Sequence, residues 1–338
     1  MKKILYIDLL SPTGHQKFNE LTLKALLKSF EVTTIAKHNF AKTFSPDITI
    51  PDVFFTNYNK IHYRIVEIKK INWVINKVKK LETFDLMIFS SYETISFSIK
   101  SRELGKLGSK IAIFNHNNLD ELDNSKIKKT IFKKINTNII QLVFEDYMKK
   151  YLLDNIKVKN KVIVVPHIVE DMKYISNSDN SSLKIFIPSK NYNFHYINEL
   201  INNSNNNVHF TIKSEFEFNK GNVISKPYFN QNEYEAIFGD ANFIILPLNV
   251  KYNYRISNLI NECFSFSKPC FTFNSKLTQY LNHLYPEVVH IIHDKTNIKK
   301  IIKEYENINN QIFKIERERF LKEHSESIFL NKISEIFD

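Results

Sequence analysis

Short apolar runs recur along the first half of the chain, each followed by a stretch with apolar residues at helical spacing. This pattern predicts strands at 2–8, 31–36, 85–90, 109–115, 138–144 and 161–166. It predicts helices at 17–30, 61–81, 93–105, 126–136 and 145–155. Regular alternation of strands and helices is typical of a parallel sheet that is covered by helices on both faces.

The same pattern restarts after the polar stretch SNSDNSS at 176–182. Strands are expected at 182–188, 207–213, 222–227, 242–247, 268–273 and 287–292, and helices at 193–202, 230–240, 257–267, 276–284, 297–308 and 311–337. We therefore predict an α/β chain of two doubly wound, Rossmann-like domains facing a central cleft. The expected boundaries are 1–168 and 183–338, with a hinge at 169–182 and a last helix that can pack back on the first domain.

The length of the chain agrees with two domains, and the distribution of charge distinguishes the first half from the second. The chain has 338 residues, more than one core usually serves. Residues 1–170 hold 28 Lys and Arg against 17 Asp and Glu, whereas 171–338 hold 19 of each. The whole net charge of +11 thus lies in the first half, which indicates an anionic partner there or simply a solvated lysine surface.

Several kinds of site have no signal in the sequence. Neither a G-x-G-x-x-G nor a G-x-x-x-x-G-K-[ST] pattern occurs, and there is no D-x-D or G-x-S-x-G. The two cysteines, Cys263 and Cys270, cannot form a disulfide framework and have no partners spaced for zinc. The sequence therefore favours a cytoplasmic protein without a tightly bound cofactor or metal.

The most informative loop follows the apolar strand that ends at Pro247. It carries Tyr254 and Arg255, and Ser257 is placed to cap the next helix. Free backbone N–H groups at a helix start, together with an arginine, suit a diphosphate. Glu262 lies farther along the helix, where its carboxylate could accept ribose hydroxyls. The plainer interpretation is a capped helix with one surface arginine and one surface glutamate.

Pro247, Arg255, Ser257, Glu262 and Lys268-Pro269 together resemble the donor-binding segment of GT-B glycosyltransferases of the group 1, family 4-like kind. The first strand with its following Gly14-His15, and the strand 109–115 followed by His116, also resemble that family. The likeness covers most of the chain, with loose motifs. It departs from the family where Tyr254 replaces a glutamate, where Pro188-Ser189-Lys190 replaces a glycine turn, and where Ser267 precedes Lys268.

The resemblance implies roles for individual residues. Catalytic-side candidates are His116, Gly14 and His15, with His15 also open to a role as a helix cap. Diphosphate, ribose and base contacts on the donor side are implied for Ser189, Lys190, Tyr228, Tyr254, Arg255, Ile256, Ser257, Asn258 and Glu262. A nucleotide-diphosphate sugar, first of all a UDP-sugar, is the implied donor substrate.

The resemblance thus implies a retaining, metal-independent transferase that acts on a glycan or lipid-linked glycan in bacterial surface polysaccharide synthesis. The basic first half suggests peripheral attachment to the anionic inner face of the cytoplasmic membrane. A sugar-nucleotide epimerase of similar fold is the alternative enzyme. A non-enzymatic nucleic-acid or anionic-surface binder is the alternative from another class, although no nucleic-acid recognition motif is present, so we expect no nucleic-acid partner.

Overall fold

The computed structural model describes the chain except residues 11–14, 56–59, 173–181, 190–193, 249–251 and 294. These described residues divide into two compact units. The first consists of Met1–Ile168 together with His324–Asp338, and the second of Val169–Glu323. Both are α/β units, so the predicted fold class is confirmed. Within the described ranges, no helix is both long and apolar enough to cross a lipid bilayer.

A seven-stranded parallel sheet in the order β3-β2-β1-β4-β5-β6-β7 forms the centre of the first unit. Every residue of the central strand β4 is buried, because helices cover both faces. The strands are β1 (Lys3–Asp8), β2 (Glu31–Ala36), β3 (Ile48–Thr49), β4 (Leu86–Ser91), β5 (Lys110–Phe114), β6 (Ile139–Val143) and β7 (Val162–Val164).

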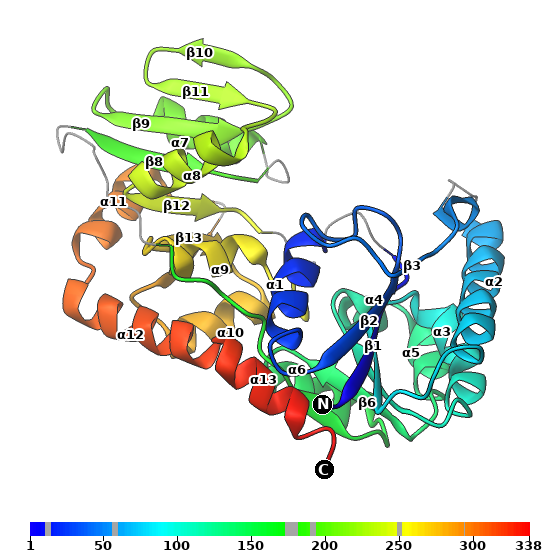
Figure 1. The fold of residues 1–338 in the computed structure, drawn as a ribbon. Helices are drawn as coiled ribbons and strands as arrows, with labels where there is room; N and C mark the ends of the chain where they lie inside the picture. Colours follow the sequence, from blue (N-terminus) through cyan, green and yellow to red (C-terminus); the bar gives the residue numbers. More distant parts are fainter. Residues whose placement is uncertain (11–14, 56–59, 173–181, 190–193, 249–251, 294) are drawn as a thin grey trace. The chain divides into compact units, whose positions relative to one another are not determined.

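The helices of the first unit form two groups (Figure 1). Helix α3 packs against both α2 and α5, and α1 contacts the C-terminal α13. The bounds are α1 (Gln16–Leu26), α2 (Lys60–Val78), α3 (Thr94–Leu104), α4 (Asn118–Asn124), α5 (Lys126–Phe132), α6 (Asp146–Lys150) and α13 (Glu326–Ser334). A short 3-10 turn at Asp52–Phe55 precedes α2, and a π-helical turn at Tyr151–Ile156 continues α6.

The second unit has its own seven-stranded sheet in the order β10-β11-β9-β8-β12-β13-β14. Its strands are β8 (Leu183–Ile187), β9 (Val208–Lys213), β10 (Phe218–Lys220), β11 (Val223–Lys226), β12 (Phe243–Leu246), β13 (Cys270–Phe273) and β14 (Val289–Ile292). Its helices are α7 (Phe194–Asn202), α8 (Gln231–Asp240), α9 (Asn258–Ser265), α10 (Lys276–Leu284), α11 (Ile298–Glu306) and α12 (Asn310–Glu323).

One sequence-based expectation about these elements is wrong, and one strand has no counterpart among the predicted elements. The edge strand β10 pairs antiparallel with β11, so the second sheet is mixed rather than wholly parallel. The long helix predicted at 311–337 is two helices, because α12 ends at Glu323 and Ser325 caps the start of α13. The side-chain oxygen of Ser325 accepts a bond from the Ile328 N–H, a local interaction that competes with continuation of the helix.

Candidate functional site

The first sheet changes direction between the neighbouring strands β1 and β4. The chain leaves β1 toward β2 on one side and leaves β4 toward β5 on the other. In open α/β sheets, ligands bind in the crevice outside the carboxyl ends of the strands at such a point. A cavity of about 430 Å³ lies there, within the volume range of small-molecule sites. Its lining includes His15, Arg64, Glu93, His116, Glu121 and Lys128.

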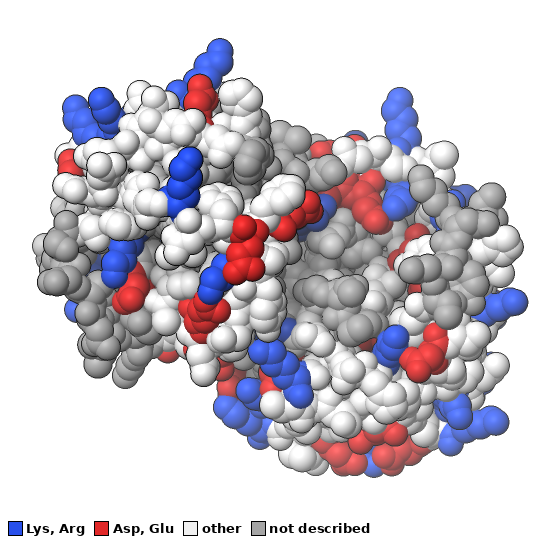
Figure 2. Space-filling view, turned by 90° about the horizontal axis from the view of Figure 1, so that it is seen from above, with Lys and Arg blue, Asp and Glu red and all other residues white. Residues whose placement is uncertain are grey.

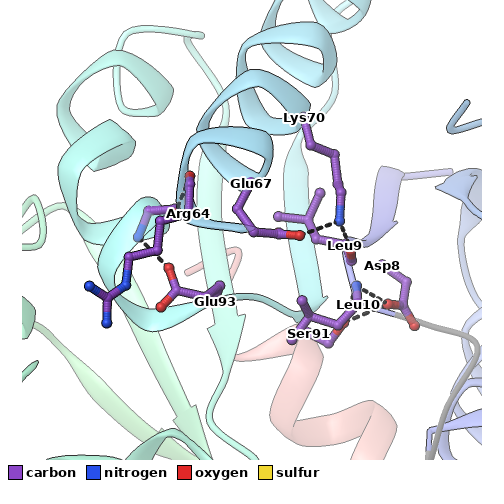
Figure 3. Close-up of polar contacts among 9 residues, drawn as sticks. Asp8, Leu9, Leu10, Arg64, Glu67, Lys70, Ser91 and Glu93 are labelled. Carbon is purple, nitrogen blue, oxygen red and sulfur yellow. Dashed lines mark hydrogen bonds and ion pairs between the residues drawn. The ribbon is translucent and has the colours of Figure 1, made fainter. Parts of the chain in front are cut away.

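A buried carboxylate fixes the ends of β1 and β4 beneath this cavity (Figure 3). The Leu10 N–H donates to Asp8 Oδ1 at 3.0 Å, and the Ser91 hydroxyl donates to the same oxygen at 2.5 Å. The Asn19 amide donates to the other oxygen of Asp8 and also to the carbonyl of Phe40. Leu10 and Ser91, which line the cavity, are therefore held by one buried group.

A buried ion pair on α2 holds the same strand end from the other side (Figure 3). The Lys70 ammonium donates to the Leu9 carbonyl at 2.8 Å and to Glu67 Oε1 at 2.6 Å, and lies 4.2 Å from the centre of the Phe55 ring. Both charged side chains are 1% exposed. Burial lowers the pKa of Lys70 and raises that of Glu67. The second oxygen of Glu67, Oε2, is buried without a hydrogen-bond partner.

The two histidines implied on the catalytic side come together in the first unit. The centres of the His15 and His116 rings lie 4.3 Å apart, edge to face. His15 occupies the N-cap position of α1, but its side chain makes no cap hydrogen bond. Nε2 of His116 is buried without a hydrogen-bond partner. Gly14, the third residue implied here, lies outside the described residues.

Burial sets the charge of these histidines. It lowers the pKa of His15, and it lowers that of His116 well below the usual range, with His15 and His167 adding to the effect. Both rings are therefore neutral at physiological pH. The cavity thus holds two uncharged imidazoles beside two carboxylates and two cations.

The residues implied on the donor side gather at the carboxyl edge of the second sheet. This sheet changes direction between β8 and β12, which pair in parallel. Ser189 follows β8, and the segment Tyr254–Asn258 follows β12. Lys190, implied as a phosphate-binding residue, lies outside the described residues. The second unit therefore has its own candidate ligand position at a switch point.

The helix start expected at this position is confirmed. Ser257 is the N-cap of α9, and its hydroxyl accepts from the Ile260 N–H. Asn258 begins the helix and is exposed, whereas Ile256 is half-buried. Glu262 follows on α9, and the Tyr234 hydroxyl of α8 donates to its Oε2 at 2.7 Å. The bond fixes this carboxylate, and Tyr234 is a neighbour that the sequence pattern did not reveal.

Aromatic rings position the charged groups of the preceding loop. The Arg255 guanidinium lies 5.1 Å from the centre of the Tyr252 ring. Tyr254 is buried, and the Lys276 ammonium donates to its hydroxyl and lies 4.4 Å from its ring centre. Tyr254 thus joins this loop to the start of α10, and Lys276 is a second cation that the sequence analysis missed.

Tyr228 stands apart from these contacts. Its side chain is 72% exposed, next to the buried Phe229 in the loop before α8. An exposed ring at this edge of the sheet is available for stacking on a planar ligand.

Comparison with known proteins identifies a fold. No protein-family profile and no curated protein matches the sequence. A solved structure from E. coli, described as trehalose-6-phosphate bound with UDP-2-fluoro glucose, matches with a TM-score of 0.71 at 8% identity over 100% of this chain and 99% of that chain. The glycotransferase of kitacinnamycin matches with a TM-score of 0.61 at 8% identity, over 100% of this chain and 99% of that chain.

A putative UDP-N-acetylglucosamine 2-epimerase from Listeria monocytogenes also matches, with a TM-score of 0.60 at 10% identity over 94% of this chain and 90% of that chain. At these identities the likeness shows the fold alone. That fold is GT-B, with two Rossmann-like domains, as the sequence resemblance implied.

Proposed function

We propose that this chain is a glycosyltransferase that moves a sugar from a nucleotide-diphosphate sugar, first of all a UDP-sugar, to a glycan or lipid-linked glycan. One observation carries the proposal: Arg255 and the capped start of α9 lie together at the switch point of the second sheet. This is a combination of cation and free N–H groups that suits a diphosphate. The fold shared with nucleotide-sugar enzymes supports the proposal.

The proposed reaction assigns the two switch points to the two substrates. The donor diphosphate binds at Arg255 and the start of α9, with Ser189 and Lys190 after β8, while Glu262 holds the ribose and Tyr228 lies by the base. The bond from the anomeric carbon to the diphosphate breaks, a bond from that carbon to the acceptor hydroxyl oxygen forms, and the hydroxyl proton passes to the departing diphosphate. Cations and N–H groups at the diphosphate stabilise the charge that develops on this leaving group. The acceptor hydroxyl enters the first-unit cavity, where His15 and His116 face it without adding charge.

The finer features of the proposal rest on the sequence resemblance. They are membership of the group 1 kind, retention of configuration, independence of metal, and a role in bacterial surface polysaccharide synthesis. The residues described include no cluster of His, Cys, Asp and Glu that could hold a metal ion.

Replacing Arg255 with alanine tests the donor site. We expect the wild-type protein to gain thermal stability with one of UDP, GDP, CMP, ADP or dTDP, by about 2.7 kcal/mol at a hundredfold excess over the dissociation constant. Arg255→Ala should bind that nucleotide about 10- to 150-fold more weakly, because a charge-assisted hydrogen bond contributes about 1.5–3 kcal/mol. Arg102→Ala, at an exposed position in the first unit, is the control. If the nucleotide stabilised Arg255→Ala and Arg102→Ala equally, Arg255 and the start of α9 would be ruled out as the diphosphate position.

We also propose that the first unit attaches to an anionic membrane surface. Three isoleucines on helices that pack together are strongly exposed: Ile65 by 46%, Ile99 by 54% and Ile127 by 70%. Arg64 precedes Ile65, Lys100 follows Ile99, and Lys126 and Lys128 flank Ile127, a combination suited to anionic headgroups. More protein should therefore sediment with anionic than with neutral liposomes at low salt, and Ile127→Ser should reduce the difference. Equal sedimentation with both would contradict attachment.

The two alternatives differ in what supports them. An epimerase is favoured by the likeness to the Listeria structure, and it would convert the donor sugar without an acceptor. A nucleic-acid binder has less support. On the face shown in Figure 2, Lys and Arg are dispersed among Asp, Glu and uncharged residues rather than joined in one basic surface.

A further inference from the structure

The cavity of the first unit is balanced in charge. Glu93 and Glu121 contribute two carboxylates to its lining, and Arg64 and Lys128 contribute two cations. His15 and His116 add no charge, as shown above. The ionisable groups among the described residues that line the cavity therefore sum to zero at neutral pH.

Much of the hydrogen-bonding capacity of these groups is unused. Glu93 accepts from the Ser96 N–H with Oε2, as the cap of α3. Glu121 uses Oε2 for both the Thr94 hydroxyl at 2.8 Å and the Lys128 ammonium at 2.9 Å. Within the part of the chain that is described, Oε1 of each glutamate has no partner, and neither does the guanidinium of Arg64. Nε2 of His116 is likewise buried and unpaired.

The carboxylates of the cavity repel an anionic ligand, and its cations repel a cationic one. A diphosphate or a uronate would have to approach Glu93 and Glu121, and an ammonium would have to approach Arg64 and Lys128. Like charges repel, and each charged ligand must also lose part of its hydration to enter the cavity. An uncharged ligand with many hydroxyls meets no such penalty, because each hydroxyl both donates and accepts.

We propose that the cavity selects an uncharged sugar ring, with Glu93 and Glu121 as the residues that set this specificity. Ring hydroxyls donate to the free Oε1 atoms of the two glutamates and accept from the Arg64 guanidinium. Tyr63, which also lines the cavity, offers a hydroxyl and an aromatic surface. This inference rests on the proposed function, in which the neutral sugar is the accepting end of the glycan. A lipid diphosphate attached to that glycan stays outside the cavity.

Saturation-transfer NMR on the full chain tests the inference. The probes are the methyl glycosides of glucose, galactose, mannose and N-acetylglucosamine, compared with the anionic methyl glucuronide and glucose 1-phosphate. We expect binding of at least one neutral glycoside and none of the anionic probes. Glu121→Gln should weaken binding of the neutral glycoside about 10-fold, because the sugar hydroxyl then donates to a neutral amide oxygen instead of a carboxylate, and the charge-assisted bond is the stronger of the two. The same variant should let the glucuronide bind, because the cavity then carries a net positive charge.

Glu217→Gln is the matched control, an exposed glutamate of the second unit whose replacement should change neither result. The inference is overturned if no neutral glycoside binds or if the anionic probes bind the wild type equally well. It is also overturned if Glu121→Gln changes neutral and anionic binding alike, as a purely structural role would. Nucleotide-induced stabilisation of the same samples separates the two proposals. If a nucleotide stabilises the protein but no saccharide binds, only the selection of a neutral sugar is contradicted. If a saccharide binds but no nucleotide stabilises the protein, the donor site is contradicted.

Discussion

Replacing Lys70 with methionine is expected to lower the free energy of unfolding of the first unit by about 3–5 kcal/mol, because the variant leaves Glu67 as a buried charge without a counter-ion. Lys70 donates to both Glu67 and the Leu9 carbonyl, and methionine can do neither. Trp73, the single tryptophan of the chain, lies on the same helix, α2. Urea unfolding followed by tryptophan fluorescence therefore reports on this unit directly.

Two comparisons show whether the effect comes from the ion pair. Lys69→Met, at the exposed neighbouring position, should change the free energy by less than about 0.5 kcal/mol. The double variant Glu67→Leu/Lys70→Met should recover much of the stability, because apolar replacements of a buried ion pair are often neutral or stabilising. The proposed energetics of the pair would be contradicted if the free energy of unfolding of Lys70→Met were within about 1 kcal/mol of the wild-type value. They would also be contradicted if the double variant were no more stable than Lys70→Met.

Acid is expected to destabilise the first unit through two buried histidines. Burial lowers the pKa of His167 to about 4 and that of His324 to about 4, from an ordinary value of 6.5. A group whose pKa is depressed on folding contributes stability above the unfolded pKa and loses it as pH falls through the folded pKa. Stability should therefore decrease between pH 6.5 and pH 4, by about 2 kcal/mol for each histidine at pH 5.

Urea unfolding at pH 7 and pH 5, again followed by Trp73 fluorescence, measures this loss. His324→Gln should reduce the difference between the two pH values by about 2 kcal/mol. His324 Nε2 lies 3.6 Å from Glu145 Oε1, but a histidine with a pKa of about 4 is neutral at pH 7, so no ion pair is lost there. His38→Gln, at an exposed position, should leave the pH dependence unchanged. A wild-type protein equally stable at both pH values would show that neither histidine is buried as described.

The elements that depend on local pattern were predictable. Strand β4 begins with the apolar run LMIF, because helices cover both faces of a parallel sheet. The cap of α9 followed from a serine placed just before an amphipathic stretch, and Ser257 does cap that helix. The short helix α4 and the edge strand β10 escaped prediction because so few residues carry too little periodicity to stand out.

What depends on tertiary contacts was not predictable. Lys70 belongs to a lysine-rich helix that the sequence indicated as a basic surface, yet it is buried and points at the end of β1. Its spacing of three from Glu67 was the available signal, but that spacing is as common on exposed helix faces. Tyr234 and Lys276 likewise reach the donor-side residues from other helices, and no spacing within the sequence reveals such contacts.

The most direct test of the transferase proposal is mass spectrometry of the complete reaction. The chain is incubated with nucleotide-diphosphate sugars that carry the nucleotide found to stabilise it. The neutral saccharide that binds to the chain is added as the acceptor. We predict equal amounts of free nucleoside diphosphate and of saccharide extended by one glycosyl unit. Both should require the saccharide, be lost in Arg255→Ala and be kept in Arg102→Ala. Conversion of the donor to an isomer without any saccharide, or no consumption of the donor at all, would contradict the proposed glycosyl transfer.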